Sequence, residues 1–95
     1  MLVGNENMKK TLKLSVEQKK ILEQSGTRMN LLTETRFIDI ARHPLYVKEI
    51  SEDELVEFLS IANALYRGGY HIISDAEYDG IYLAELQKRN PDHSY

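Results

Sequence analysis

The feature that most constrains the fold is an amphipathic segment that begins at Ser51 and ends at the glycine pair 68–69. Its apolar residues recur at steps of three and four, which places them on one face of an α-helix. These residues are Leu55, Phe58, Leu59, Ala62, Leu65 and Tyr66. Ser51 and Glu54 form a capping box, and glycine readily takes the left-handed conformation that ends helices. A helix with one apolar face must pack on other elements, so this segment predicts a core built around it.

Two shorter segments upstream also carry helix signals. The first begins with a capping box of Ser15 and Gln18 and stops at Gly26. The second is predicted over about residues 29–42 and ends before Pro44, because proline disfavours helix in the residue that precedes it. The apolar members of the second segment are Leu31, Leu32, Phe37, Ile38 and Ala41.

The last predicted helix begins at a capping box of Ser74 and Glu77 and runs to about Arg89, where Asn90-Pro91 stops it. Only a short link separates it from the Ser51 helix, so we expect the two to form an antiparallel hairpin. The sequence therefore predicts an all-α fold, a small helical domain of three to four helices that ends in this hairpin.

The chain divides by charge as well as by pattern. Residues 1–50 hold nine Lys/Arg and six Asp/Glu, whereas residues 51–95 hold three Lys/Arg and nine Asp/Glu. The acidic half is a poor surface for phosphate backbones and suits a cationic ligand, a basic partner or solubility. We expect a flexible tail over residues 1–14, a helical extension of unassigned role over residues 15–50, and the hairpin unit over residues 51–95.

Several classes of protein are excluded or disfavoured. The chain has no cysteine, which excludes disulfide scaffolds, zinc–thiolate sites and iron–sulfur sites and favours a cytoplasmic location. No apolar run approaches the ~20 residues that span a bilayer, so no membrane contact is expected. His43, His71 and His93 are too scattered for a ligand set, and we expect no metal.

A basic run near the start leaves nucleic-acid contact open. Its members are Lys9, Lys10, Lys13, Lys19 and Lys20. Such a run is more typical of a solvated helix face. A helix-turn-helix reading is weak, because that motif needs a basic recognition helix and the last helix is acidic at its start.

The stretch "SDAEYDG", residues 74–80, holds the candidate binding residues. Asp75, Tyr78 and Asp79 stand at i, i+3 and i+4 and therefore share one helix face, and Tyr82 at i+7 is expected to extend it. This arrangement presents two carboxylates and phenol rings together, turned away from the core. A solvated helix start, with Asp stabilised by the helix dipole, is the alternative reading of the same residues.

The opposite side of this helix is expected to pack on the Ser51 helix. Its residues are Ala76, Gly80, Leu83 and Ala84. Glycine inside a helix costs ~1 kcal/mol relative to alanine. A close approach of the two helices at Gly80 would explain that cost.

"ISDAEYDGIYLAELQKRNPDH", with "LYRGGYHI" before it, resembles the N-terminal nicotinamide mononucleotide-binding domain of bacterial NAD-dependent DNA ligases. The resemblance covers about residues 54–93. It implies that Tyr66, Asp75, Tyr78 and Asp79 hold the nicotinamide mononucleotide half of NAD, which is a substrate of these enzymes. Arg67 stands where the family has histidine and is the fifth candidate binding residue, since it could pair with the phosphate of this moiety. The stretch between Asp79 and Glu85 is one residue longer than the family pattern, which marks a divergent branch.

The resemblance also implies a role in enzyme adenylation, the first step of ligation in DNA repair and replication. The family's nucleophile lies in a Lys-x-Asp-Gly motif, and "EYDG" here puts Glu77 in the lysine position. We therefore expect no catalytic residue in these 95 residues and no activity from them alone. The implied partners are the nucleotidyltransferase domain of the same ligase chain and, only through the full enzyme, nicked DNA. We expect a piece of a longer ligase or a free-standing relic of one, and the "NPDHSY" ending favours a piece. The alternative function is a helical protein–protein interaction module without a small ligand.

Overall fold

The computed structural model describes residues 12–95, and every regular element in this range is helical. Along the chain these are α2 (Val16–Ser25), α3 (Glu34–Arg42), the 3₁₀-helix η1 (Pro44–Lys48), α4 (Glu52–Arg67), α5 (Asp75–Glu77), the π-helix η2 (Tyr78–Leu83) and α6 (Ala84–Arg89). The predicted all-α class is confirmed. Residues 1–11 lie outside the described part of the chain. They include most of the tail expected over residues 1–14, and Lys9 and Lys10 of the basic run.

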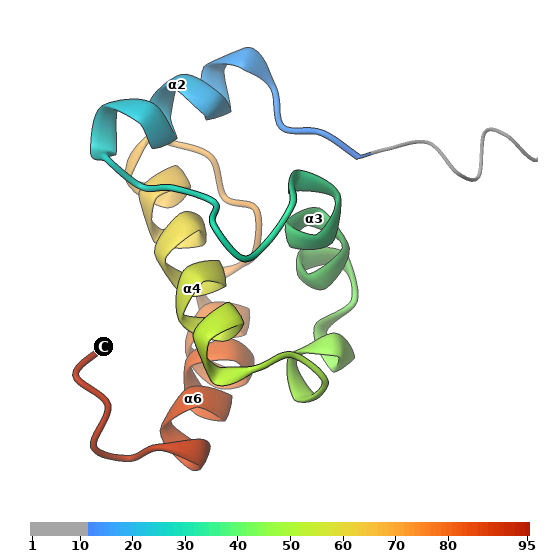
Figure 1. Ribbon diagram of the computed structural model, residues 1–95, viewed down its shortest axis with the longest axis vertical. Helices are drawn as coiled ribbons and strands as arrows, with labels where there is room; N and C mark the ends of the chain where they lie inside the picture. The colour runs from blue at the N-terminus through green and yellow to red at the C-terminus, as the bar shows by residue number, and fades with distance from the viewer. Residues whose placement is uncertain (1–11) are drawn as a thin grey trace, which may run out of the picture.

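α4 is the central helix, as its periodicity predicts (Figure 1). Both halves of its capping box are present: the Ser51 hydroxyl accepts from the Glu54 backbone, and the Glu54 carboxylate accepts from the Ser51 backbone N–H. The helix ends at Gly68, and Gly69 takes the left-handed conformation with φ 96°. The apolar face is covered except at Tyr66, because Leu55, Phe58 and their neighbours along it lie in the core.

α2 crosses the end of α4 at a very short separation (Figure 1). A Cβ added at Gly68 would lie 2.5 Å from Cδ1 of Ile21. Only glycine allows the two helices to approach this closely without displacing Ile21. Gly68 therefore caps the end of α4 and leaves the space into which Ile21 of α2 packs.

The second helix begins later than the sequence predicts. α3 starts after its N-cap Thr33, so residues 29–32 are not helical, and Leu31 is 55% exposed. The reason is tertiary: the Glu57 carboxylate on α4 accepts hydrogen bonds from the backbone N–H groups of residues 30–32, at 2.8–3.1 Å. A helix that began at residue 29 would leave these N–H groups of its first turn without intrahelical partners, whereas in the loop the Glu57 carboxylate satisfies them.

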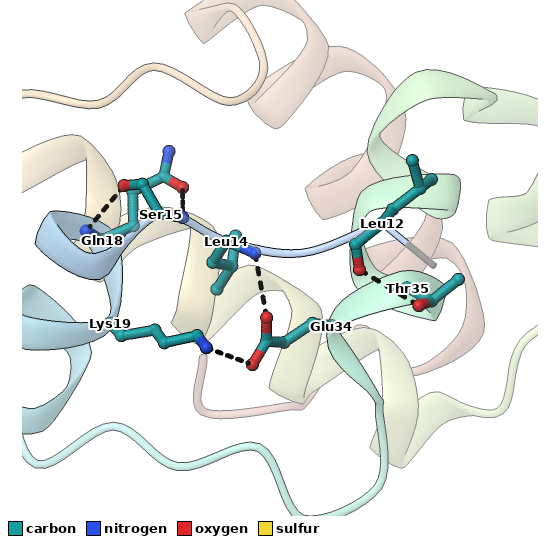
Figure 2. A network of polar contacts seen from close by, with 7 residues as sticks. All are labelled: Leu12, Leu14, Ser15, Gln18, Lys19, Glu34 and Thr35. Atoms are coloured by element: carbon teal, nitrogen blue, oxygen red, sulfur yellow. Dashed lines mark hydrogen bonds and ion pairs between the residues drawn. The ribbon is translucent and has the colours of Figure 1, made fainter. Parts of the chain in front are cut away.

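The segment before α2 is tied to α3 by the polar network of Figure 2. The Leu14 N–H donates to the Glu34 carboxylate at 2.9 Å, and the Thr35 hydroxyl donates to the Leu12 carbonyl at 3.1 Å. Leu14 itself is buried. Lys19 of the basic run pairs with Glu34 at 3.5 Å, a half-exposed contact that contributes little to stability.

The chain after Ser74 forms one continuous helix made of α5, η2 and α6, and it runs antiparallel to α4 (Figure 1). The Ser74–Glu77 capping box is present, and the helix ends at Arg89 as predicted. The Arg89 guanidinium anchors this end by donating to the backbone carbonyls of Val47 and Ile50 and to the Glu85 carboxylate, at 2.7–2.8 Å.

The π turn η2 overturns two expectations about the last helix. Gly80 is exposed and meets no other atom within 4 Å of an added Cβ, so it does not serve close packing on α4. Tyr82 does not extend the outward stripe, because its side chain is wholly buried. A π turn accommodates an extra residue and shifts the helix face of the residues that follow it. The stretch that is one residue longer than the family pattern falls in this turn.

The core is continuous from α2 to α6. Three aromatic rings from different helices form its middle: Phe37 and Phe58 lie 5.0 Å apart, and Phe58 stacks on Tyr82 at 4.5 Å. The Tyr82 hydroxyl donates to the Ile40 carbonyl at 2.7 Å, which provides the partner that a buried phenol needs. Residues on both sides of position 50 therefore share one core.

Candidate functional site

A pocket of about 200 Å³ lies between the last turns of α4 and the beginning of the final helix. It is lined by Ala62, Asn63, Tyr66, Ile72, Ile73, Asp75, Tyr78 and Asp79. Sites for drug-sized ligands typically measure roughly 300–1,000 Å³, so this pocket accommodates one ring with its substituents and leaves the rest of a larger ligand outside. Four of the five residues predicted from the sequence therefore line one pocket: Tyr66, Asp75, Tyr78 and Asp79.

Local structure explains how the two carboxylates reach the same pocket. The Ser74 cap starts the helix, so Asp75 is its first residue, and Asp79 follows at i+4 on the same side. Both aspartates are exposed at the rim. The rim is therefore acidic, whereas Ile72 and Ile73 make the interior apolar.

Tyr78 forms part of the wall and is held in place from outside. Its hydroxyl lies 2.8 Å from the hydroxyl of Tyr95, so the end of the described chain folds back onto this helix. Burial of the ring and, after it, the hydrogen bond with Tyr95 raise the pKa of Tyr78 above its ordinary value. The phenol is therefore neutral at physiological pH and presents an uncharged aromatic ring to the pocket.

Tyr66 contributes a second ring from α4. Its side chain is 43% exposed, and its ring packs against that of His71 with centroids 4.5 Å apart. His71 follows the Gly68-Gly69 turn, so the link between the helices supports the ring that faces the pocket. The two tyrosines thus line the pocket from different helices.

Arg67 is the one predicted residue that does not line the pocket. It is exposed in the last turn of α4, next to Tyr66 in sequence. Its positive charge is close enough to lower the pKa of Tyr78 slightly, against the larger effects that raise it. Arg67 therefore lies near the pocket, where it can meet a group that extends beyond the rim.

Asn63 and the two isoleucines were not singled out from the sequence. Asn63 precedes Tyr66 by one helical turn, so the i, i+3 relation to a candidate tyrosine was the signal that could have found it. Ile72 and Ile73 belong to the link between the helices, where no periodic pattern predicts which way their side chains point. In residues 12–95, no cluster of three or more His, Asp or Glu side chains could hold a metal ion. No helix in the same range is long and apolar enough to cross a membrane.

Comparison with known proteins finds similarity to short segments of DNA ligases. The chain is 47% identical over 62 residues to the DNA ligase of Desulfotalea psychrophila, which covers 65% of this chain and 9% of that protein. It is 53% identical over 45 residues to the DNA ligase of Ruthia magnifica, covering 47% of this chain and 7% of the ligase.

A longer and weaker match extends over most of the chain. The DNA ligase of Shewanella baltica is 30% identical over 86 residues, which covers 90% of this chain and 12% of that protein. The chain thus spans only about a tenth of the length of the ligases that it matches. No family model and no solved structure matches it. These similarities confirm the resemblance: the chain is a divergent relative of a domain-sized segment of DNA ligases.

Proposed function

We propose that the pocket binds the nicotinamide mononucleotide half of NAD and that the chain serves the self-adenylation step of an NAD-dependent DNA ligase. One observation carries the proposal. Two carboxylates and two phenol rings, from two helices, meet around a pocket large enough for one ring. The similarity to DNA ligases supports the proposal, because in self-adenylation by NAD such a pocket would hold the leaving group.

The chemistry of the ligand matches the chemistry of the pocket. The nicotinamide ring of NAD carries a positive charge, and the face of a tyrosine attracts a cation by about 0.5–2 kcal/mol. Asp75 and Asp79 add electrostatic attraction at the rim and can accept hydrogen bonds from ribose hydroxyls. The phosphate must remain outside so small a pocket, where exposed Arg67 is available to pair with it.

The proposed contribution to catalysis is orientation of the leaving group. A lysine of the nucleotidyltransferase domain attacks the adenylyl phosphorus, and nicotinamide mononucleotide departs with the electrons of the broken phosphoanhydride bond. Holding that group in line with the attacking lysine accelerates adenylation, because the reacting groups are already oriented when the reaction begins. The nucleophile belongs to that other domain, and Glu77, which stands at the lysine position of "EYDG", accepts a hydrogen bond from the Ser74 N–H in the capping box. Nicked DNA is engaged by the rest of the enzyme.

The direct test titrates the 95-residue chain with nicotinamide mononucleotide and follows its amide resonances by NMR. We expect millimolar binding with shifts confined to residues 62–79, and weaker binding by Asp79→Asn, which removes one rim charge without changing shape. Glu23→Gln, an exposed change on α2, is the matched control and should bind like the parent chain. Shifts spread evenly over the chain, or equal binding by Asp79→Asn, would contradict the proposal.

A second test separates the adenylation step from sealing. In a DNA ligase that carries this segment, Tyr78→Ala and Asp79→Ala should reduce self-adenylation by NAD at least about tenfold, which corresponds to one lost interaction of ~1.4 kcal/mol. Sealing of nicks that are already adenylated should change much less, because nicotinamide mononucleotide has left by then. Equal loss of both activities would refute the assigned role.

The second candidate function is a helical protein–protein interaction module. Exposed apolar residues in η1 favour it: Leu45 is 78% exposed and Tyr46 is 38% exposed. Under this alternative, the Asp79 variants leave partner binding unchanged, whereas Leu45→Ser abolishes it. Under the proposed function, Leu45→Ser leaves nicotinamide mononucleotide binding unchanged.

A further inference from the structure

Asn63 lines the pocket, and the proposed function does not account for its polar side chain. It lies on α4 one turn before Tyr66, and its half-buried side chain lines the pocket next to Ala62. Ala62 is small, so it leaves room for a ligand beside the Asn63 amide. The position faces the rim that holds Asp75 and Asp79.

Asn63 is the one amide among the side chains that line the pocket in the described part of the chain, whereas the Tyr66 hydroxyl has a single O–H donor. An asparagine amide has two N–H donors and one acceptor oxygen, whereas an ionised aspartate only accepts. The Tyr78 hydroxyl is already paired with that of Tyr95. Of the side chains that line the pocket in the described part of the chain, Asn63 alone carries an N–H donor.

We propose that Asn63 recognises the carboxamide of the nicotinamide ring and makes the pocket specific for it, an inference that rests on the proposed function. Two amides can pair through two hydrogen bonds, each donating one N–H to the other's oxygen. Nicotinate, which carries a carboxylate in place of the carboxamide, has no N–H to give and adds a negative charge near Asp75 and Asp79. The pocket therefore selects a cationic pyridine ring with an amide substituent.

The test compares ligands that differ only in this substituent. The 95-residue chain, its Asn63→Ala variant and its Asn63→Asp variant are titrated by NMR with nicotinamide mononucleotide, nicotinic acid mononucleotide and the pyridine mononucleotide that lacks the substituent. Asn30→Ala, which changes an exposed asparagine outside the pocket, is the control. Asn63→Asp preserves shape, removes both amide donors and adds a negative charge; pyridine mononucleotide, whose ring is also cationic, shows the effect of that charge alone.

The expected pattern is selective. The parent chain should bind nicotinamide mononucleotide about tenfold more tightly than either analogue, as the loss of one or two hydrogen bonds predicts. Both Asn63 variants should lose about that factor for nicotinamide mononucleotide and less than about twofold for pyridine mononucleotide.

The outcomes that contradict the inference differ from those that contradict the proposed function. If both variants lose affinity equally for all three ligands, Asn63 maintains the shape of the pocket but does not recognise the carboxamide. If Asn63→Asp changes the affinities for nicotinamide mononucleotide and for pyridine mononucleotide by the same factor, the amide donors are not used. If none of the ligands shifts the resonances of the parent chain at millimolar concentration, the proposed function fails together with this inference.

Discussion

Replacing Tyr82 by phenylalanine tests whether this residue belongs to the core. The structure buries it there, whereas the spacing in the sequence predicts that it lies on the face of Asp75 and Asp79. The ring is wholly buried and stacks on Phe58, and phenylalanine preserves both features. Only the hydroxyl is lost, together with its 2.7 Å hydrogen bond to the Ile40 carbonyl. Ile40 is also fully buried, close to the end of α3 where helix carbonyls lack intrahelical partners.

The expected cost follows from that geometry. Leaving a buried carbonyl without its partner costs about 1–3 kcal/mol. For a domain of this size each kcal/mol lowers the melting temperature by about 4–8 °C, so we expect Tyr82→Phe to melt about 5–20 °C below the parent chain. Thermal unfolding followed by circular dichroism measures this shift. Tyr46→Phe is the control, because Tyr46 is 38% exposed and should tolerate loss of its hydroxyl.

The same hydroxyl should make stability fall at alkaline pH. Burial and, after it, the charge of Glu77 raise the pKa of Tyr82 to about 12. Because the folded pKa exceeds the unfolded value near 10, the stabilisation is complete below about pH 10 and declines by about 1.4 kcal/mol per pH unit up to the folded pKa. Tyr82→Phe should lack this part of the decline. An unchanged melting temperature and an unchanged alkaline profile in Tyr82→Phe would refute the assignment of Tyr82 to the core.

Three further predictions follow from single contacts. Gly80→Ala should raise the free energy of unfolding by about 0.5–1 kcal/mol in urea denaturation, because Gly80 is helical and has open space around it; destabilisation would mean that the π turn needs glycine. Glu57→Gln should accelerate hydrogen exchange of the amides of residues 30–32 and cost about 1–2 kcal/mol, with Asp53→Asn as the control that changes neither. Tyr95→Phe should lower the pKa of Tyr78, measured by NMR titration, while burial keeps it above its ordinary value; an unchanged pKa would show that the contact with Tyr95 is not formed.

Predictions that depend on local chemistry agree well with the structure. The capping boxes at Ser15, Ser51 and Ser74 each start a helix, and Gly26 and Gly68 each follow the end of one. Capping involves residues three positions apart, so neighbouring sequence is enough to predict it. For the same reason the clustering of Asp75, Tyr78 and Asp79 was predictable, since all three lie within about one turn of a helix whose start is fixed by Ser74.

The exceptions are positions where a distant residue or a change of helix type decides. Nothing near residues 30–32 indicates that the Glu57 carboxylate, some 25 positions later, satisfies their N–H groups, although Thr33, which caps α3, is a local signal for the later start. Tyr82 has the spacing of an outward residue, but the π turn carries it into the core. Periodicity arguments assume a constant number of residues per turn, so they fail after such a turn.

The sequence by itself determined most of the helix ends, because caps, glycines and prolines act on their immediate neighbours; the start of α3 is the exception. It also identified the acidic and aromatic residues of the candidate site. Only the tertiary structure decided that Tyr66 and Asn63 of α4 meet Asp75 and Asp79 across one pocket while Arg67 lies outside it. The physical reason is that a pocket depends on how two helices pack, and that packing is set by the shared core and the close approach at Gly68.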